Sequence, residues 1–159
     1  MDEELLDLLL GLDGVRQSPR YHPEGDALFH SLQVFELARR ESDDPELWAA
    51  ALLHDVGKEI DGATHDEVGA DLLEGLMSDR VVWLVRNHLC LLRDPRRARR
   101  ELAGTPQLRD LEHLRRWDVG GRRKNASVGS ADDALSFLLN QAGSVIFAEP
   151  TQHHERNDR

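Results

Sequence analysis

Apolar residues recur along most of the chain at three- and four-residue spacings, which is the pattern of amphipathic helices. An opening helix is predicted in "DEELLDLLLGL", ended near Gly14, and a loop follows at 18–25. Further helices are predicted at 27–40, 44–54, 64–76, 78–85, 106–117 and 132–141, with connectors at 56–64 and 89–105. Since no stretch alternates as a strand would, the sequence predicts an all-α fold, a single compact helical bundle.

Capping residues stand where several of these helices should begin. Asp26, Asp44 and Ser78 each precede an apolar repeat and are predicted N-caps. Thr64 has Glu67 three residues later, which is the spacing of a capping box. These local signals set the expected helix boundaries.

Composition favours one domain. The 159 residues are 40% apolar and only 5% aromatic, so the core must be built mainly from Leu, Val and Ala. We expect a helical domain at 1–145 and a polar tail at 146–159. The lone Cys90 excludes an internal disulfide, the acidic start does not resemble a signal peptide, and apolar runs stop at about five residues. A cytoplasmic protein with no membrane partner is therefore expected.

Charge is distributed unevenly around a net value of −10. Residues 1–80 carry 20 acidic against 6 basic side chains, whereas residues 86–124 carry 12 basic against 5 acidic. An acidic protein with one basic segment is not a general nucleic-acid binder, but it fits an anionic ligand bound locally. For "RDPRRARR" (93–100) a solvated helix face is the simpler interpretation.

Good metal ligands occur at or near the ends of helices that must be buried. The apolar run of "ALLHDVGKEI" ends in His54 and Asp55, and the other inward-facing positions are His30, His65, His88 and Asp118. One such histidine is usually a satisfied core residue, but burying this whole set is costly unless the side chains are paired or bind metal. Imidazole and carboxylate suit Fe, Mn, Zn, Co or Ni, and the single cysteine excludes a structural thiolate zinc site.

The order of these residues resembles the HD superfamily of metal-dependent phosphohydrolases, whose signature matches "HDVGK". The flanks are similar to the HD domain of bacterial CCA-adding tRNA nucleotidyltransferases over about residues 20–125. The similar stretches are "HPEGDALFH" (22–30), "LLHDVGK" (52–58), "HDEVGADLL" (65–73) and "WDVGGR" (117–122). No counterpart of the nucleotidyltransferase portion is visible, so the resemblance does not imply CCA addition.

The resemblance implies one or two divalent metal ions, drawn from Fe, Mn, Ni, Co, Zn and Mg. A minimal site would hold one ion, and the two added histidines imply a second ion with Asp55 as the bridge. The first ion would take His30, His54, Asp55 and Asp118, and the second would take Asp55, His65 and His88. Paired ions of this kind can clamp both oxygens of a phosphoryl transfer.

Lys58 and Arg122 each lie a few residues past a proposed ligand and are predicted to hold phosphate oxygens, with Asp55 as the third catalytic residue. Only two of the 20 basic residues are lysines, which favours a function for Lys58. The expected reaction is hydrolysis of a phosphomonoester or phosphodiester, such as a nucleotide, by metal-activated water. Two alternatives stay open: a mixed-valence di-iron oxygenase, and a non-catalytic metal-stabilised module that associates with nucleotides or RNA.

Overall fold

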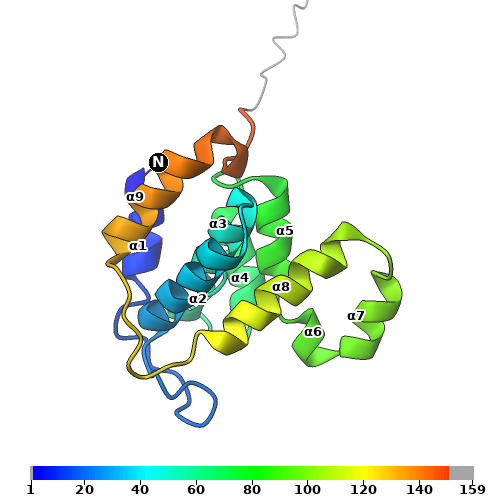
Figure 1. Cartoon of the computed structure of the whole chain (residues 1–159), viewed down its shortest axis with the longest axis horizontal. Helices are drawn as coiled ribbons and strands as arrows, with labels where there is room; N and C mark the ends of the chain where they lie inside the picture. The colour runs from blue at the N-terminus through cyan, green and yellow to red at the C-terminus, as the bar shows by residue number, and fades with distance from the viewer. Residues whose placement is uncertain (1, 151–159) are drawn as a thin grey trace, which may run out of the picture.

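The computed structural model describes residues 2–150, and the elements formed there are helices joined by loops (Figure 1). No β-strand forms in this part of the chain; there are only isolated bridges, from Arg16 to Asp26 and from Met77 to Phe147. The α-helices are α1 (Asp2–Leu10), α2 (Ala27–Glu41), α3 (Pro45–Leu53), α4 (His65–Leu73), α5 (Asp79–Asn87), α6 (Cys90–Arg93), α7 (Pro95–Glu101), α8 (Pro106–Gly120) and α9 (Ala131–Ala142). Two short 3-10 helices are η1 (Val56–Glu59) and η2 (Gly143–Ile146). The predicted all-α class is confirmed.

Most of the predicted caps form. The side chains of Asp26, Asp44 and Ser78 accept hydrogen bonds from backbone N–H groups in the first turns of α2, α3 and α5. The capping box at Thr64 is wrong, because this side chain makes no capping hydrogen bond. Its φ and ψ of −118° and 26° lie outside the extended region that aims an N-cap side chain at the helix.

The predicted connector at 89–105 is also wrong in part, since it contains α6 and α7. Asp94 caps α7 by accepting from the backbone N–H of Arg97, and Pro95 occupies the first turn. Only Ala98 of α7 is buried, so the sequence carries no apolar stripe to reveal the helix. Together α6 and α7 form an arm beside α8 (Figure 1).

The core consists of two apolar clusters that share α2, α3 and α5. One cluster packs these helices against α1, α4 and α9 and includes Phe35; the other packs them against α6, α7 and α8 and includes Trp117. Figure 1 shows α1 and α9 on one side of the molecule and α6 to α8 on the other. The Trp117 indole N–H donates to Glu41 at 2.6 Å, so its polar atom is satisfied.

The first residues of the predicted tail pack onto the domain. Ile146 is fully buried, and Phe147 pairs with Met77 across an isolated bridge. Residues 151–159 lie outside the described part of the chain, so the division between 145 and 146 stays a prediction. Among the described residues, no helix combines the length and apolar character needed to cross a membrane.

Candidate metal centre

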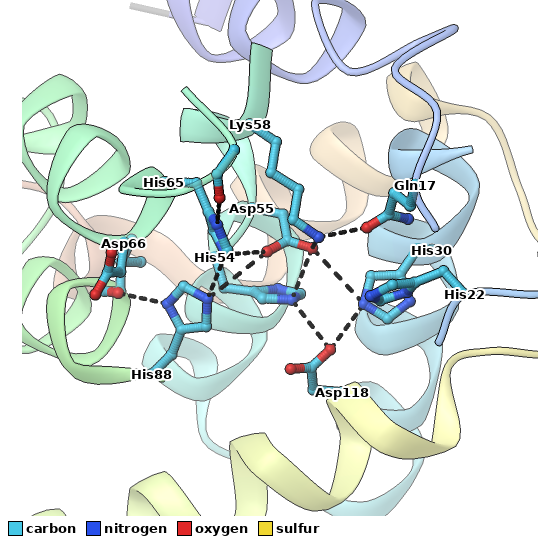
Figure 2. Close-up of polar contacts among 12 residues, drawn as sticks. Gln17, His22, His30, His54, Asp55, Lys58, His65, Asp66, His88 and Asp118 are labelled. Atoms are coloured by element: carbon cyan, nitrogen blue, oxygen red, sulfur yellow. Dashed lines mark hydrogen bonds and ion pairs between the residues drawn. The ribbon is translucent and has the colours of Figure 1, made fainter. Parts of the chain in front are cut away.

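Five helices bring the six predicted ligands together (Figure 2). The first turns of α2 contribute His30, the first position of α4 contributes His65, and the end of α8 contributes Asp118. The other ligands directly follow helix ends: His54 and Asp55 follow α3, and His88 follows α5. All six residues are at most 8% exposed; they are His30, His54, Asp55, His65, His88 and Asp118. Packing therefore gathers polar groups that are far apart in sequence into one buried cluster.

Asp55 stands at the centre of this cluster, and its two oxygens face different histidines. Oδ2 lies 3.7 Å from His30 Nε2 and 3.3 Å from His54 Nε2. Oδ1 lies 3.2 Å from His65 Nε2 and 3.7 Å from His88 Nε2. Metal–ligand bonds of about 2.0–2.2 Å place neighbouring ligand atoms roughly 3.0–3.4 Å apart, close to the separations in both groups.

Asp118 extends the group around Oδ2 of Asp55. Its Oδ1 lies 2.8 Å from His30 Nε2 and 3.6 Å from His54 Nε2. Its Oδ2 lies 3.6 Å from the Arg115 guanidinium. The first group thus contains two imidazoles and two carboxylates, and the second contains two imidazoles and the other oxygen of Asp55.

All four imidazoles direct the same nitrogen toward a backbone carbonyl. The Nδ1 atoms lie 2.5–2.8 Å from these oxygens, in the pairs His30–Gly121, His54–Ala51, His65–Gly62 and His88–Val85. A carbonyl can only accept, so each Nδ1 carries the hydrogen and donates. In the neutral ring this leaves the lone pair on Nε2, which is the atom that faces Asp55 and the atom that a metal needs.

Unsatisfied atoms mark the middle of the cluster. Within the described residues, His54 Nε2 and Asp55 Oδ2 are buried and form no hydrogen bond. Buried polar atoms are normally hydrogen-bonded. The two atoms lie 3.3 Å apart, and the Lys58 ammonium, 3.0 Å from Asp55 Oδ2, gives an ionic partner to the carboxylate only. A divalent cation would satisfy both atoms, and imidazole and carboxylate are ligand types that transition metals accept.

The cluster's charges are strongly coupled in the metal-free chain. Burial alone would lower the pKa of His54, but the Asp55 and Asp118 carboxylates outweigh burial and raise it to about 10. Burial alone would raise the pKa of Asp55, but His54 and Lys58 hold it well below its usual range. In the metal-free protein a protonated His54 thus offsets the carboxylates, and a metal ion would replace that proton.

The two predicted phosphate-binding side chains lie against the carboxylates. Lys58 Nζ is 3.0 Å from Asp55 Oδ2 and also donates a hydrogen bond to Gln17 Oε1 (Figure 2). Arg122 Nη2 is 4.0 Å from Asp118 Oδ1, and its side chain is partly buried. Both cations therefore border the cluster, one beside each carboxylate.

Sequence reasoning missed several residues that support the cluster. Gln17 contacts Lys58 from a loop with no helical or motif signal. Glu24 contacts His30, and its place in the "HPEGD" flank was the available signal. Gly57 lets η1 approach α4, since a Cβ there would lie 2.3 Å from the His65 carbonyl oxygen.

Comparison with known proteins places these residues in a family. The sequence profile described as "HD domain" matches residues 28–119, which is more than half of the chain. The family predicted from the motifs is therefore confirmed.

Curated relatives resemble a part of the chain. The "Multifunctional CCA protein" of Hahella chejuensis is 38% identical over 81 residues, which cover 46% of this chain and 19% of that protein. The protein of the same name from Halorhodospira halophila is 42% identical over 74 residues, covering 42% and 18%. The one from Nitrosococcus oceani is 51% identical over 47 residues, covering 30% and 12%. The matched segment thus spans less than a fifth of each relative.

Proposed function

We propose that this chain, which belongs to the HD domain family, is a metal-dependent phosphohydrolase that acts on a phosphomonoester or phosphodiester. The observation that carries the proposal is that the two carboxylate oxygens of Asp55 face different histidines. Oδ2 faces His30 and His54, and Oδ1 faces His65 and His88. A carboxylate placed in this way can bridge two cations, and two-metal sites are common in enzymes that transfer phosphoryl groups.

The first ion would be held by His30, His54, Asp55 Oδ2 and Asp118, and the second by Asp55 Oδ1, His65 and His88. Divalent metal in these positions would supply an activated water as nucleophile and neutralise the phosphate oxygens. The protein's own part is to keep every Nδ1 bound to a carbonyl, so that each Nε2 stays aimed at the ions.

Lys58 and Arg122 would hold the substrate. Their cationic groups border the ligand carboxylates, where phosphate oxygens would reach the ions. The Lys58 ammonium would act as a point charge, and the Arg122 guanidinium could make two parallel hydrogen bonds. A substrate with both a negative charge and a scissile phosphate ester fits these contacts.

A nucleotide is the substrate class that we favour. The relatives that match part of this chain are named multifunctional CCA proteins, and the segment at 86–124 is basic within an acidic chain. Association with RNA and a cytoplasmic location are further predictions from the sequence. The second set, with His65 and His88, is also compatible with the di-iron oxygenase, which is the second candidate.

A phosphate-release screen tests the proposal. Nucleoside mono-, di- and triphosphates, cyclic nucleotides and an aryl phosphate would be incubated with Mn, Co, Ni, Mg or Zn. We expect release from at least one substrate, loss of release in Asp55→Ala, and retention in Asp132→Ala, whose side chain is exposed at the start of α9. Phosphate release from no substrate, together with oxygen consumption by an iron-loaded form, would favour the oxygenase. Inactivity in both assays would favour the non-catalytic module.

A further inference from the structure

The loop before α2 delivers a buried carboxylate to the outer side of the metal centre. Glu24 lies in this loop, and its side chain is 0% exposed. Its Oε1 is 3.1 Å from His30 Nδ1 and 2.8 Å from His22 Nδ1. Burying a charged side chain is costly unless it is paired. The two imidazoles compensate Oε1, whereas Oε2 is buried without a hydrogen-bond partner.

His30 differs from the other imidazoles of the centre in where its Nδ1 partners lie. The Nδ1 atoms of His54, His65 and His88 each donate to the carbonyl of the residue three positions earlier. His30 lies within the first turns of α2, and its own backbone N–H already uses the Asp26 carbonyl. Its Nδ1 therefore depends on groups outside the helix, the Gly121 carbonyl at 2.8 Å and Glu24.

Contacts on both sides of Glu24 hold the loop in place and so restrict the position of the carboxylate. Gly25 has a φ of 84°, which favours glycine, and its N–H donates to the His22 carbonyl at 3.0 Å. Asp26 then caps α2 through the Phe29 N–H. On the other side, the His22 imidazole reaches the same Oε1 that faces His30.

We propose that Glu24 is a positioning residue that, together with the Gly121 carbonyl, anchors the Nδ1–H of His30 and so holds Nε2 of that ring toward Asp55 and Asp118. The inference rests on the proposed function only for the presence of a metal, because the ring's orientation is set by the chain itself. Glu24 precedes the family match at 28–119, so the loop adds a support that the matched residues do not contain. Carboxylates that orient ligand histidines typically affect metal affinity by about 10–100-fold.

Two measurements on Glu24→Ala and Glu24→Gln test the inference. Both ring nitrogens of His30 face acceptors in the metal-free protein, Nδ1 the Gly121 carbonyl and Nε2 the Asp118 carboxylate. Nitrogen-15 NMR of this protein reports the Nδ1–H and Nε2–H resonances of His30, and calorimetry with Mn²⁺ reports affinity. In Glu24→Ala the Gly121 carbonyl is the remaining acceptor for Nδ1–H, so we expect a shifted Nδ1–H resonance of His30 and at least a tenfold loss of affinity, within the range given above. Glu24→Gln keeps an oxygen acceptor, so it should retain most of the affinity while shifting the Nδ1–H resonance. Glu36→Gln on α2 is the matched control and should change neither.

The two possible failures can be told apart. An unchanged His30 spectrum in both Glu24 variants would overturn the positioning role, and Glu24→Gln decides this even if Glu24→Ala does not fold. If the wild-type protein binds no metal but the spectra change as expected, the proposed function fails and the positioning role stands. If both Glu24 variants bind Mn²⁺ as the wild type does, Glu24 does not support the centre.

Discussion

The Nε2 atoms of His65 and His88 face each other at 3.2 Å, while both Nδ1 atoms donate to backbone carbonyls. In the neutral rings this arrangement points two lone pairs at one another, which is unfavourable unless a cation lies between them. A proton can serve, but burial lowers the pKa of His88 and opposes protonation there. A metal ion held by His65, His88 and Asp55 would relieve the repulsion.

The first prediction is therefore that His88→Ala loses one of two metal ions. Elemental analysis of protein purified without chelator should show metal content falling by about half, because the second set keeps only His65 and Asp55 Oδ1. His113→Ala is the control, since that ring packs at a tilt against Trp117, with the centroids 5.7 Å apart, and is not among the ligand groups. Equal metal content in His88→Ala and wild type would contradict a second site and leave a single-metal hydrolase.

The second prediction concerns pH. The pKa of His54 is raised to about 10 in the metal-free chain, above its ordinary 6.5, so the ring is protonated at pH 7 and metal must displace that proton. Apparent affinity for Mn²⁺ should rise with pH by roughly tenfold per unit from near 7 toward 10, for one proton released. Calorimetry in buffers of different ionisation enthalpy would measure the proton count, and a value near zero at pH 7 would refute the coupling.

The raised pKa of His54 also predicts how the free energy of unfolding of the metal-free protein changes with pH. A folded-state pKa above the unfolded value favours the folded state when the ring is protonated, so this contribution of His54 is fully present below about pH 6.5. It is lost progressively as pH rises toward 10. Urea unfolding of chelator-treated protein at several pH values would follow this loss, with the His54→Ala variant as the reference.

The third prediction is that Lys58 and Arg122 hold substrate but not metal. Lys58→Ala or Arg122→Ala should weaken substrate binding or turnover by roughly 10–100-fold, the equivalent of one hydrogen bond to a charged group. Metal content should stay at the wild-type value. Lys124→Ala is the control, because Lys124 is the other lysine and is exposed. A bound phosphate that contacts neither side chain in a crystal structure would argue against this role.

The fourth prediction tests the close approach of η1 to α4. In Gly57→Ala the new Cβ would meet the His65 carbonyl oxygen at 2.3 Å and the Gly69 nitrogen at 2.7 Å. Both are backbone atoms that cannot move aside cheaply, so we expect destabilisation of about 2–3 kcal/mol in urea unfolding. Gly62→Ala, where a Cβ meets nothing within 4 Å, should stay within about 0.5 kcal/mol of wild type. Similar values for the two variants would disprove the contact.

The sequence alone determined most of the helices and the identity of the candidate ligands. Apolar periodicity and caps such as Asp26 and Ser78 depend on residues at most four positions apart. They can therefore be recognised in the sequence before the tertiary structure is known. The same local reasoning failed for α7, where only Ala98 is buried, and for Thr64, where the backbone angle disables the cap.

Only the tertiary structure decided how those ligands meet. His30 and Asp118 are 88 positions apart, and their 2.8 Å contact depends on how α2 packs against α8. Helix packing likewise brings one pair of imidazoles to each carboxylate oxygen of Asp55. Loop geometry brings Glu24 to His30. Such distances are set by the sum of many side-chain contacts in the two clusters of the core, which no short stretch of sequence contains.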